Sequence, residues 1–372
     1  MRIVLSGGGT GGHIYPSITI AKAISRLEHT DILFIGTKEG LEADIIPKEG
    51  FNFATIDVRG FERRFSLPNM ITVAKAASSI WRAKDMIDNF KPDIVIGTGG
   101  YVCGPVLMAA CWAGVPTLIQ EQNAIPGITN KLLSYFVDKI AIGYHESATY
   151  FYKPEKTFFS GNPIRNEVLT AHRENGIREL GLKQDKLTLL VSGGSRGARS
   201  INSAMIAVHK YFSNHNDIQI LHITGQNEYN SLVGNLVQSG IDITGVGNSM
   251  IRPYLYNMPS ALAVADLAIF RAGAIGLAEL TARGVPAILI PYPFAAANHQ
   301  EFNARILEKK GAAKVIRDSE LTGEVLIENI ERLLKDRVLL ANMSEASRAM
   351  GHPHAADVIA QQAFQLQASR KK

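Results

Sequence analysis

A glycine-rich segment near the start of the chain combines a tight backbone turn with a titratable side chain. Residues 7–12 follow an apolar run, and His13 comes directly after them. Glycine lets a backbone turn sharply and approach a ligand closely, and a helix that begins there presents its N-terminus to an anion. A neutral imidazole, whose usual pKa is about 6.5, can accept a proton from a hydroxyl group. The segment therefore predicts a ligand-binding turn, with His13 as a candidate general base.

The same turn fits the G-x-G-x-x-G pattern of dinucleotide-binding sites, through Gly7, Gly9 and Gly12. That pattern needs an acidic residue at the end of the second strand to bind a ribose hydroxyl group. The nearest acid, Glu39, lies beyond the expected end of that strand. A nicotinamide-dependent dehydrogenase and a plain strand–helix turn therefore both remain open as interpretations.

Two later segments repeat the strand–turn–helix pattern. Residues 192–197 add hydroxyl groups and a guanidinium to a glycine-rich turn, which suits a diphosphate. Residues 271–279 end in Glu279, whose carboxylate could accept hydrogen bonds from ribose hydroxyl groups. The alternatives are a plain turn and, for Glu279, a first-turn charge that complements the helix dipole. Polar clusters at 123–127 and 291–300 follow two more expected strands.

The sequence lacks a D-x-D motif for binding a diphosphate through a metal ion. We therefore expect no metal at the candidate turns, where backbone N–H groups could bind a diphosphate. The two cysteines, Cys103 and Cys111, lie eight residues apart, and this spacing predicts neither a disulfide framework nor a zinc site.

Short apolar runs alternate with helical patterns along most of the chain, which predicts parallel sheets covered by helices on both faces. The expected strands are 2–6, 31–36, 53–57, 93–97, 116–119, 139–142, 187–192, 218–224, 268–270 and 287–290. The candidate turns then lie at the carboxyl ends of strands, where open α/β sheets bind ligands.

The chain consists of two similar halves. Residues 5–13 align without gaps to residues 191–199, in the same strand–turn–helix context. The predicted fold class is α/β, with two tandem Rossmann-like doubly wound domains. We expect the first domain at 1–162 and the second at 163–352, with a C-terminal helix within 353–372 that packs back on the first.

The composition is that of a globular protein. Of the 372 residues, 46% are hydrophobic and 20% are charged, and the net charge is +5. Neither half is strongly basic, which argues against a broad nucleic-acid-binding face. The longest uncharged stretch, 94–120, is interrupted by glycine and proline, so we expect no transmembrane helix.

One stretch, 59–84, contains six basic residues and a single acid, with apolar residues at near-helical spacing between them. Such a stripe can belong to a core, but tryptophan beside arginine also suits docking on an anionic membrane surface. The candidate membrane contacts are Ile71, Lys75, Trp81 and Arg82, and Trp112 could join them.

Five segments together resemble one family. They are GGGTGGHIYP, EQNAIPG, GGSRGA, RAGAIGLAEL and PYPFAAANHQEFNA, and they occur in the family's order from the N-terminus onward. The family is that of the MurG-type transferases of peptidoglycan synthesis. The resemblance implies an enzyme of the GT-B type that needs no metal and no other cofactor, and whose two domains face each other across a cleft. Without a metal, backbone N–H groups would stabilise the leaving diphosphate.

The resemblance also implies an activity, the inverting transfer of N-acetylglucosamine from UDP-N-acetylglucosamine to the muramyl 4-hydroxyl of undecaprenyl-pyrophosphoryl-MurNAc-pentapeptide. It implies a peripheral enzyme on the cytoplasmic face of the cell membrane. Its partners would be these two substrates and an anionic membrane surface, without nucleic acid. A UDP-N-acetylglucosamine 2-epimerase of similar fold is the nearest alternative, and a non-catalytic membrane scaffold is another.

The resemblance assigns the donor site mainly to the second half. Ser195 would contact the diphosphate, Arg165 the nucleotide and Gln300 the donor sugar. Tyr254 would lie by the uracil, and Leu255 would read the base through its backbone. The residues that would line the donor are Ala274, Ile275, Gly276, Leu277, Ala278 and Glu279, with Glu279 on the ribose.

From the first half, the resemblance implies that His13 faces the acceptor. The residues that would close over the donor sugar are Thr10, Gly11, Gly12 and Asn123. One departure concerns Ile275 and Gly276, which stand where the family commonly has a hydroxyl-bearing residue.

Overall fold

The structure is a computed structural model, and it describes residues 1–58, 67–194, 196–241 and 247–370, with the side chains of 67–77 also outside the description. The chain divides into two compact units. One consists of Met1–Arg165 together with His352–Lys372, and the other of Asn166–Gly351.

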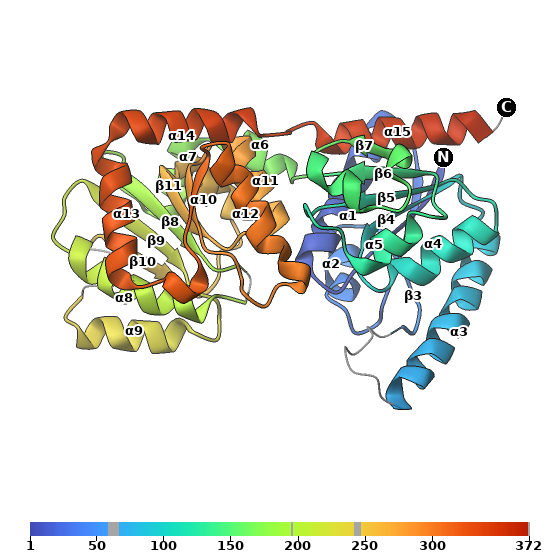
Figure 1. Ribbon diagram of the computed structural model, residues 1–372, viewed down its shortest axis with the longest axis horizontal. Helices are drawn as coiled ribbons and strands as arrows, with labels where there is room; N and C mark the ends of the chain where they lie inside the picture. Colours follow the sequence, from blue (N-terminus) through green and yellow to red (C-terminus); the bar gives the residue numbers. More distant parts are fainter. Residues whose placement is uncertain (59–66, 195, 242–246, 371–372) are drawn as a thin grey trace. The chain divides into compact units, whose positions relative to one another are not determined.

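The described part of the first unit is built on one parallel sheet. Its strands are β1 (Arg2–Gly7), β2 (Asp31–Gly36), β3 (Asn52–Thr55), β4 (Ile94–Gly99), β5 (Thr117–Glu121), β6 (Lys139–Ile142) and β7 (Thr157–Phe159). Their order across the sheet is β3-β2-β1-β4-β5-β6-β7, and each neighbouring pair is parallel (Figure 1).

Helices cover both faces of this sheet. On β1, Ile3 and Leu5 pack into the core that contains helices α1 and α15, whereas Val4 packs into the core of α3 and α4. A sheet buried on both faces explains why its strands are nearly continuous apolar runs. The helices are α1 (Gly11–Leu27), α2 (Glu42–Lys48), α3 (Leu67–Phe90), α4 (Cys103–Trp112), α5 (Ile128–Leu133) and α15 (Ala355–Arg370), with 3₁₀ turns η1 (His145–Tyr150) and η2 (Pro154–Lys156).

The C-terminal helix belongs to the first unit. Helix α15 packs along α1 (Figure 1), and its Ile359 lies in the same core as Ile3. Polar contacts hold both of its ends, because Arg26 of α1 pairs with Asp357 at 2.7 Å, and Arg370 pairs with Asp138 at 2.7 Å.

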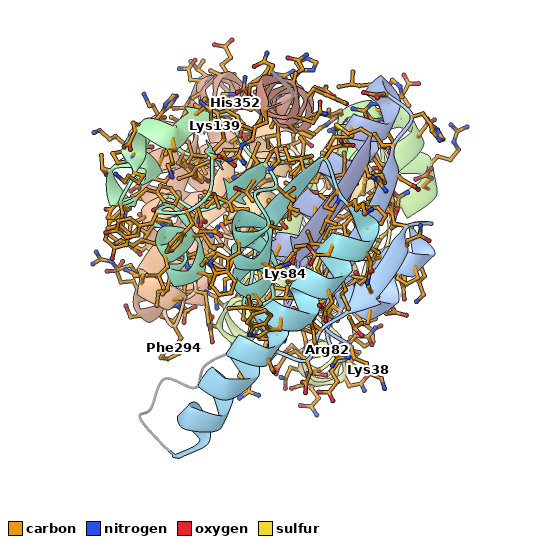
Figure 2. All side chains as sticks on the ribbon, turned by 90° about the vertical axis from the view of Figure 1, so that its right-hand side faces the viewer. Lys38, Arg82, Lys84, Lys139, Phe294 and His352 are labelled. Carbon is orange, nitrogen blue, oxygen red and sulfur yellow. The ribbon has the colours of Figure 1, made fainter. Side chains whose placement is uncertain are left out.

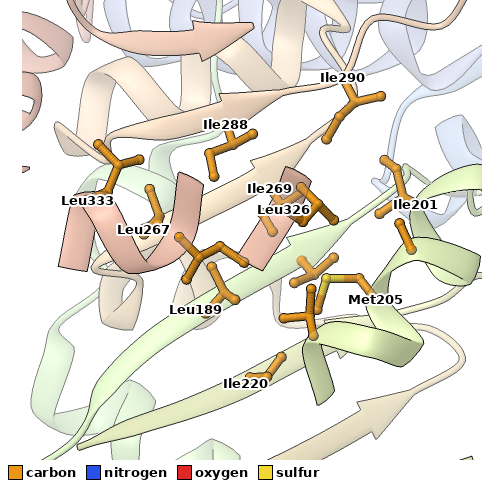
Figure 3. Packing of buried hydrophobic residues seen from close by; sticks show 14 of the residues in the cluster. Leu189, Ile201, Met205, Ile220, Leu267, Ile269, Ile288, Ile290, Leu326 and Leu333 are labelled. Atoms are coloured by element: carbon orange, nitrogen blue, oxygen red, sulfur yellow. The ribbon is translucent and has the colours of Figure 1, made fainter. Parts of the chain in front are cut away.

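The described part of the second unit repeats this architecture. Its strands are β8 (Leu187–Ser192), β9 (Ile218–Ile223), β10 (Ser249–Arg252), β11 (Leu267–Phe270), β12 (Ala287–Leu289) and β13 (Ala313–Val315), in the order β10-β9-β8-β11-β12-β13. Its helices are α6 (Asn166–Thr170), α7 (Arg173–Leu180), α8 (Arg199–Phe212), α9 (Tyr229–Gln238), α10 (Met258–Val264), α11 (Ala274–Arg283), α12 (His299–Lys309), α13 (Gly323–Lys335) and α14 (Arg337–Ala349), with 3₁₀ turns η3 (Ala296–Asn298) and η4 (Asp318–Glu320). Figure 3 shows the core in which Leu189 and Ile269 of the strands meet Met205 of α8 and Leu326 of α13.

Both sheets reverse their strand order next to their first strand. The reversal lies between β1 and β4 in the first unit and between β8 and β11 in the second. The two glycine-rich turns that align in the sequence follow β1 and β8, so they occupy equivalent places. The predicted fold class, two Rossmann-like doubly wound α/β domains, is confirmed.

Candidate active site

The reversal in the first sheet brings two glycine-rich turns together. The N–H of Gly8, after β1, donates to the carbonyl of Gly99, at the end of β4, at 3.4 Å. The Oγ1 of Thr98 on β4 donates to the main-chain carbonyl of His13 at 2.7 Å, which ties the start of α1 to β4. In open α/β sheets, such a reversal is where ligands bind.

His13 lies in the first turn of α1 and is half-buried. Its Nδ1 lies 3.2 Å from the carbonyl oxygen of Gly8 and 3.4 Å from Oγ1 of Thr10. A carbonyl oxygen can only accept a hydrogen bond, so the neutral ring carries its hydrogen on Nδ1. Nε2 is then the basic nitrogen, which is the form that a general base requires.

A buried carboxylate that did not stand out in the sequence shapes the first glycine turn. Glu42, at the start of α2, is 1% exposed. One of its oxygens accepts from the N–H of Gly9 at 3.0 Å, and the other accepts from the N–H and Oγ1 of Thr37 at 3.1 and 2.7 Å. A Cβ on Gly8 would lie 2.5 Å from this carboxylate. The acid that reaches the turn is therefore Glu42 rather than Glu39, and it binds protein backbone.

A second buried carboxylate shapes the turn that contains Asn123. Glu121, the last residue of β5, is 1% exposed. Its Oε1 accepts from the backbone N–H and Nδ2 of Asn123 at 2.9 and 3.1 Å. Its Oε2 accepts from the N–H of Gly127 and from Nδ2 of Asn130 at 3.1 and 2.9 Å. The side-chain amide of Asn123 is therefore held at the end of the strand next to β4.

The other predicted residues of the first unit gather around the start of α1. Thr10 precedes the helix, and Gly11 and Gly12 are its first two residues. Arg165 lies nearby, because its guanidinium carbon is 5.4 Å from the centre of the Tyr15 ring on the same helix. A Cβ on Gly11 would lie 3.3 Å from that ring.

In the second unit, residues 193, 194 and 196–198 lie between β8 and α8. Gly194 and Gly197 have positive φ angles of 89° and 76°, a conformation that favours glycine, and the N–H of Gly197 donates to the carbonyl of Gly194 at 2.9 Å. Arg196 is exposed. The predicted diphosphate contact Ser195 lies outside the described residues.

Helix α11 follows β11 and carries the predicted ribose contact. Ala274 and Leu277 are buried, whereas Ile275, Gly276 and Ala278 are half-buried. Glu279 is 7% exposed and lies in the second turn of the helix, so its interpretation as a first-turn charge is wrong.

The arginine before this helix is engaged within the unit. Arg271 donates to Asp318 at 2.5 Å and to Oγ of Ser200 at 2.8 Å. Its guanidinium also lies over the Tyr292 ring, 5.6 Å from the ring centre.

The segment before α12 is conformationally unusual. Ala297 and Asn298 both have positive φ angles, 50° and 54°, which non-glycine residues seldom adopt. Oε1 of Gln300 accepts from the N–H of Tyr292 at 2.9 Å. The Nε2 of Gln300 is the donor group of the same amide. A pocket of about 570 Å³ opens here, and its lining is Pro291, Pro293, Phe294, Asn298, Glu301, Arg317, Asp318 and Ser319.

The two predicted base contacts follow β10. Tyr254 and Leu255 are half-buried, and the ring of Tyr254 meets that of the exposed Tyr256, with centroids 4.9 Å apart. The side chains of Tyr254 and Leu255 are therefore partly accessible to solvent.

Helix α3 presents a tryptophan to solvent. Trp81 is 64% exposed, and Arg82 beside it is exposed too, whereas Ala83 and Ile87 are buried. Figure 2 labels Arg82 and Lys84 on this helix. The core interpretation is therefore wrong for Trp81. Among the described helices, none combines the length and the apolar character that crossing a bilayer requires.

The other proposed membrane contacts are only partly described. Trp112, at the end of α4, is 57% exposed. The side chains of Ile71 and Lys75 lie outside the described residues.

The chain matches two models of one family. Residues 3–142 match the glycosyltransferase family 28 N-terminal domain, and residues 188–359 match the glycosyltransferase family 28 C-terminal domain. Together these matches cover most of the chain and include both glycine-rich turns.

Curated relatives carry a more specific description. A UDP-N-acetylglucosamine–N-acetylmuramyl-(pentapeptide) pyrophosphoryl-undecaprenol N-acetylglucosamine transferase from Desulforamulus reducens is 50% identical to this chain, over 96% of the chain and 97% of the relative. A transferase of the same name from Halothermothrix orenii is 48% identical over the same shares.

Solved structures show the same fold. MurG from Acinetobacter baumannii has a TM-score of 0.76 at 27% identity, covering 98% of this chain and 99% of that one. A UDP-N-acetylglucosamine 2-epimerase from Neisseria meningitidis, bound to UDP-N-acetylglucosamine, has a TM-score of 0.70 at 12% identity, covering 98% and 100%. At that identity the second likeness concerns the fold alone.

Proposed function

The chain belongs to glycosyltransferase family 28, and on that premise we propose how its residues carry out the reaction of its MurG-type relatives. The enzyme transfers N-acetylglucosamine from UDP-N-acetylglucosamine to the muramyl 4-hydroxyl of undecaprenyl-pyrophosphoryl-MurNAc-pentapeptide, which converts lipid I to lipid II. The observation that carries this function is the 50% identity to such a transferase over nearly the whole of both chains.

The acceptor hydroxyl is activated by His13. The 4-hydroxyl oxygen attacks C1 of the donor sugar, its proton passes to Nε2 of His13, and the bond between C1 and the diphosphate oxygen breaks. The hydrogen bond between Nδ1 and Gly8 at 3.2 Å supports this role, because it fixes the ring orientation and the tautomer. A single displacement of this kind inverts the configuration at C1.

The developing charge on UDP is stabilised by the turn at 193–198 and the N-terminus of α8. Backbone N–H groups at such a terminus act on the leaving group without a metal ion. Ser195 adds a hydroxyl group to this turn.

Other residues hold the rest of the donor. Glu279 binds the ribose, Tyr254 and Leu255 hold the uracil, and Arg165 acts on the nucleotide. The remaining proposed donor contacts, mostly to the transferred sugar, are Thr10, Gly11, Gly12, Asn123, Ala274, Ile275, Gly276, Leu277, Ala278 and Gln300.

The acceptor is attached to a membrane lipid, so the enzyme must reach a membrane surface. We propose that α3 binds the cytoplasmic face of the cell membrane peripherally, through Ile71, Lys75, Trp81 and Arg82. The exposure of Trp81 supports this, because a tryptophan next to a cation suits the boundary between headgroups and acyl chains.

The test is release of UDP from UDP-N-acetylglucosamine with and without the lipid-linked muramyl acceptor. We expect release only with the acceptor, and none with an acceptor that lacks the 4-hydroxyl group. This matched pair isolates the reacting hydroxyl, because the lipid and the peptide are the same in both.

Two other outcomes would contradict the proposal. Interconversion of UDP-N-acetylglucosamine with its 2-epimer in the absence of acceptor would indicate an epimerase. Tight binding of a nicotinamide dinucleotide, seen by its absorbance and fluorescence, would indicate a dehydrogenase.

A further inference from the structure

A chain of hydrogen bonds between buried polar groups runs through the second unit, and the mechanism above uses none of them. Oγ of Ser249 lies 2.7 Å from Nδ1 of His209, whose Nε2 lies 3.1 Å from Nδ1 of His222. Nε2 of His222 lies 3.0 Å from Oδ1 of Asn202, whose Nδ2 donates to the carbonyl of Thr224 at 3.0 Å. All five residues are buried. We call this series the Ser249–Thr224 chain.

The hydrogen bonds of the Ser249–Thr224 chain have one consistent direction. The carbonyl of Thr224 only accepts, so Asn202 presents Nδ2 to it and Oδ1 to His222. Nε2 of His222 is therefore protonated, and Nδ1 of His222 accepts from His209. His209 then accepts from the hydroxyl group of Ser249 at its own Nδ1. Both imidazole rings are neutral in this arrangement.

Burial favours the same neutral state. It lowers the pKa of His209 to about 3. It also lowers the pKa of His222 well below its usual value, and a charge on His209 would lower it further. A buried polar chain of this kind is stabilising only when each member has its partner, so its geometry is sharply defined.

The Ser249–Thr224 chain ends at a carbonyl group that contacts the backbone of Gly197. Thr224 directly follows β9, and a Cβ on Gly197 would lie 2.1 Å from its carbonyl oxygen. A Cβ on Gly225 would lie 2.6 Å from both N and Cα of Gly197. The backbone at 224–225 therefore contacts the backbone of Gly197 directly, and neither Gly197 nor Gly225 has room for a side chain. A displacement of the Thr224 carbonyl would pass directly to the glycine-rich turn.

Asn202 connects this contact to α8. It is the fourth residue of the helix, and its N–H donates to the carbonyl of Ala198 at 2.9 Å. Its side chain reaches Thr224, so one residue joins the start of α8 to the end of β9.

We propose that the Ser249–Thr224 chain positions the backbone of Gly197 and Ala198 for the donor diphosphate, with Asn202 as its main positioning residue. The inference rests on the proposed donor function of the turn at 193–198. These hydrogen bonds fix the backbone of Gly197 and Ala198, directly before α8, and binding of a diphosphate depends on where the N-terminus of that helix lies.

The test is the affinity of the full-length protein for UDP, measured by calorimetry, with Asn202→Ala as the variant. Asn248→Ala is the matched control. Asn248 is also a buried asparagine whose Nδ2 donates to backbone carbonyls, but these belong to Phe212 at 3.0 Å, to Ser213 at 3.3 Å and to His215, at the opposite end of α8. Its Oδ1 accepts from Nζ of Lys186 at 2.6 Å. Both variants lose the buried hydrogen bonds of a side-chain amide in the same unit, so both are expected to have lower melting temperatures.

Only Asn202→Ala is expected to weaken UDP binding, by roughly tenfold, whereas Asn248→Ala stays within about twofold of the parent. In turnover assays the KM for the donor should rise in Asn202→Ala more than kcat falls. A purely structural role predicts equal UDP affinities for the two variants, and that result would overturn the proposal.

A second variant covers the case in which Asn202→Ala does not fold. His222→Phe keeps the ring volume and removes the bond that orients the Asn202 amide, so UDP binding should weaken relative to Asn248→Ala. Unchanged affinity in His222→Phe overturns the proposal in that case. If the parent itself does not bind UDP, the donor function of the turn is wrong, which is a separate result from equal binding by all variants.

Discussion

The imidazole of His13 lies against Gly99, where any other residue would have its Cβ. A Cβ on residue 99 would come within 2.8 Å of Cδ2 and 3.0 Å of Nε2 of His13. Gly99 also has a φ of 106°, which side chains rarely adopt. Because Gly99 has no side chain, the end of β4 has room for the His13 ring, and the basic nitrogen Nε2 lies beside that strand end.

Replacing His13 by alanine should lower kcat by roughly 10²- to 10⁴-fold, the usual range for a positioned general base. UDP binding should stay near that of the parent, since the ring contacts the first unit's own backbone. Steady-state kinetics and calorimetry on the same preparation check this. Turnover near that of the parent in a folded variant would remove His13 from the mechanism.

Replacing Glu279 by alanine should raise the KM for the donor by about tenfold, which corresponds to about 1.4 kcal/mol for a charge-assisted hydrogen bond. The carboxylate is 7% exposed, so the melting temperature should be recorded alongside. Donor affinity equal to that of the parent would place the ribose contact on another residue.

Turnover should survive exhaustive chelation. The D-x-D motif is missing from the sequence, and among residues 1–58, 67–194, 196–241 and 247–370 no three His, Cys, Asp or Glu side chains gather to hold a metal ion. Activity is measured before and after treatment with a chelator. Complete loss, restored only by Mg²⁺ or Mn²⁺, would refute metal independence.

The Trp81→Ala, Arg82→Ala double variant should sediment less with anionic vesicles than the parent, and the binding of both should fall as salt rises. Each basic residue near an anionic surface contributes about 1 kcal/mol, and salt screens this contribution over roughly 8 Å. Thermal stability should change little, because Trp81 is 64% exposed. The control is Lys38→Ala, which removes one positive charge from another exposed residue of the same unit and leaves α3 unchanged. Unchanged vesicle binding by the double variant would contradict membrane docking through α3.

The free energy of unfolding should fall as the pH falls from about 6.5 toward 3. Burial lowers the pKa of His209 to about 3 in the folded protein, whereas an unfolded histidine has a pKa of about 6.5. Between these values the unfolded chain binds more protons, so acid favours unfolding by up to about 1.4 kcal/mol per pH unit for each such histidine. Above about pH 6.5 this contribution is complete and constant.

Urea denaturation at several pH values measures this slope. A His209→Gln, His222→Gln variant should be less stable at pH 7.5 but should lose less further stability between pH 6.5 and 5. Equal slopes in the variant and the parent would show that other groups govern the acid sensitivity.

Much of the fold is predictable because buried parallel strands are continuous apolar runs. The central strands β1, β4 and β8 all stand out in the sequence for this reason. Strands β7, β10 and β13 do not. Each is an edge strand of three or four residues, and an edge strand needs less apolar sequence than a strand between two neighbours.

The site is predictable only where the residue type itself is unusual for its position. The glycine-rich turns and His13 stand out because glycine runs and a histidine are rare at strand ends. Glu42 and Glu121 do not stand out, because their role depends on which backbone N–H groups the fold brings to them. The contact between His209 and His222 follows from neither motif nor spacing, because it joins a helix to the strand after it.

The two buried carboxylates of the first unit have a consequence for ligand affinity. Glu42 and Glu121 hold their turns through hydrogen bonds within the protein. The conformational entropy of ordering these turns is therefore lost on folding, and binding does not lose it again. Such preorganisation should let even a fragment of the donor that carries the transferred sugar bind to these turns in its final pose.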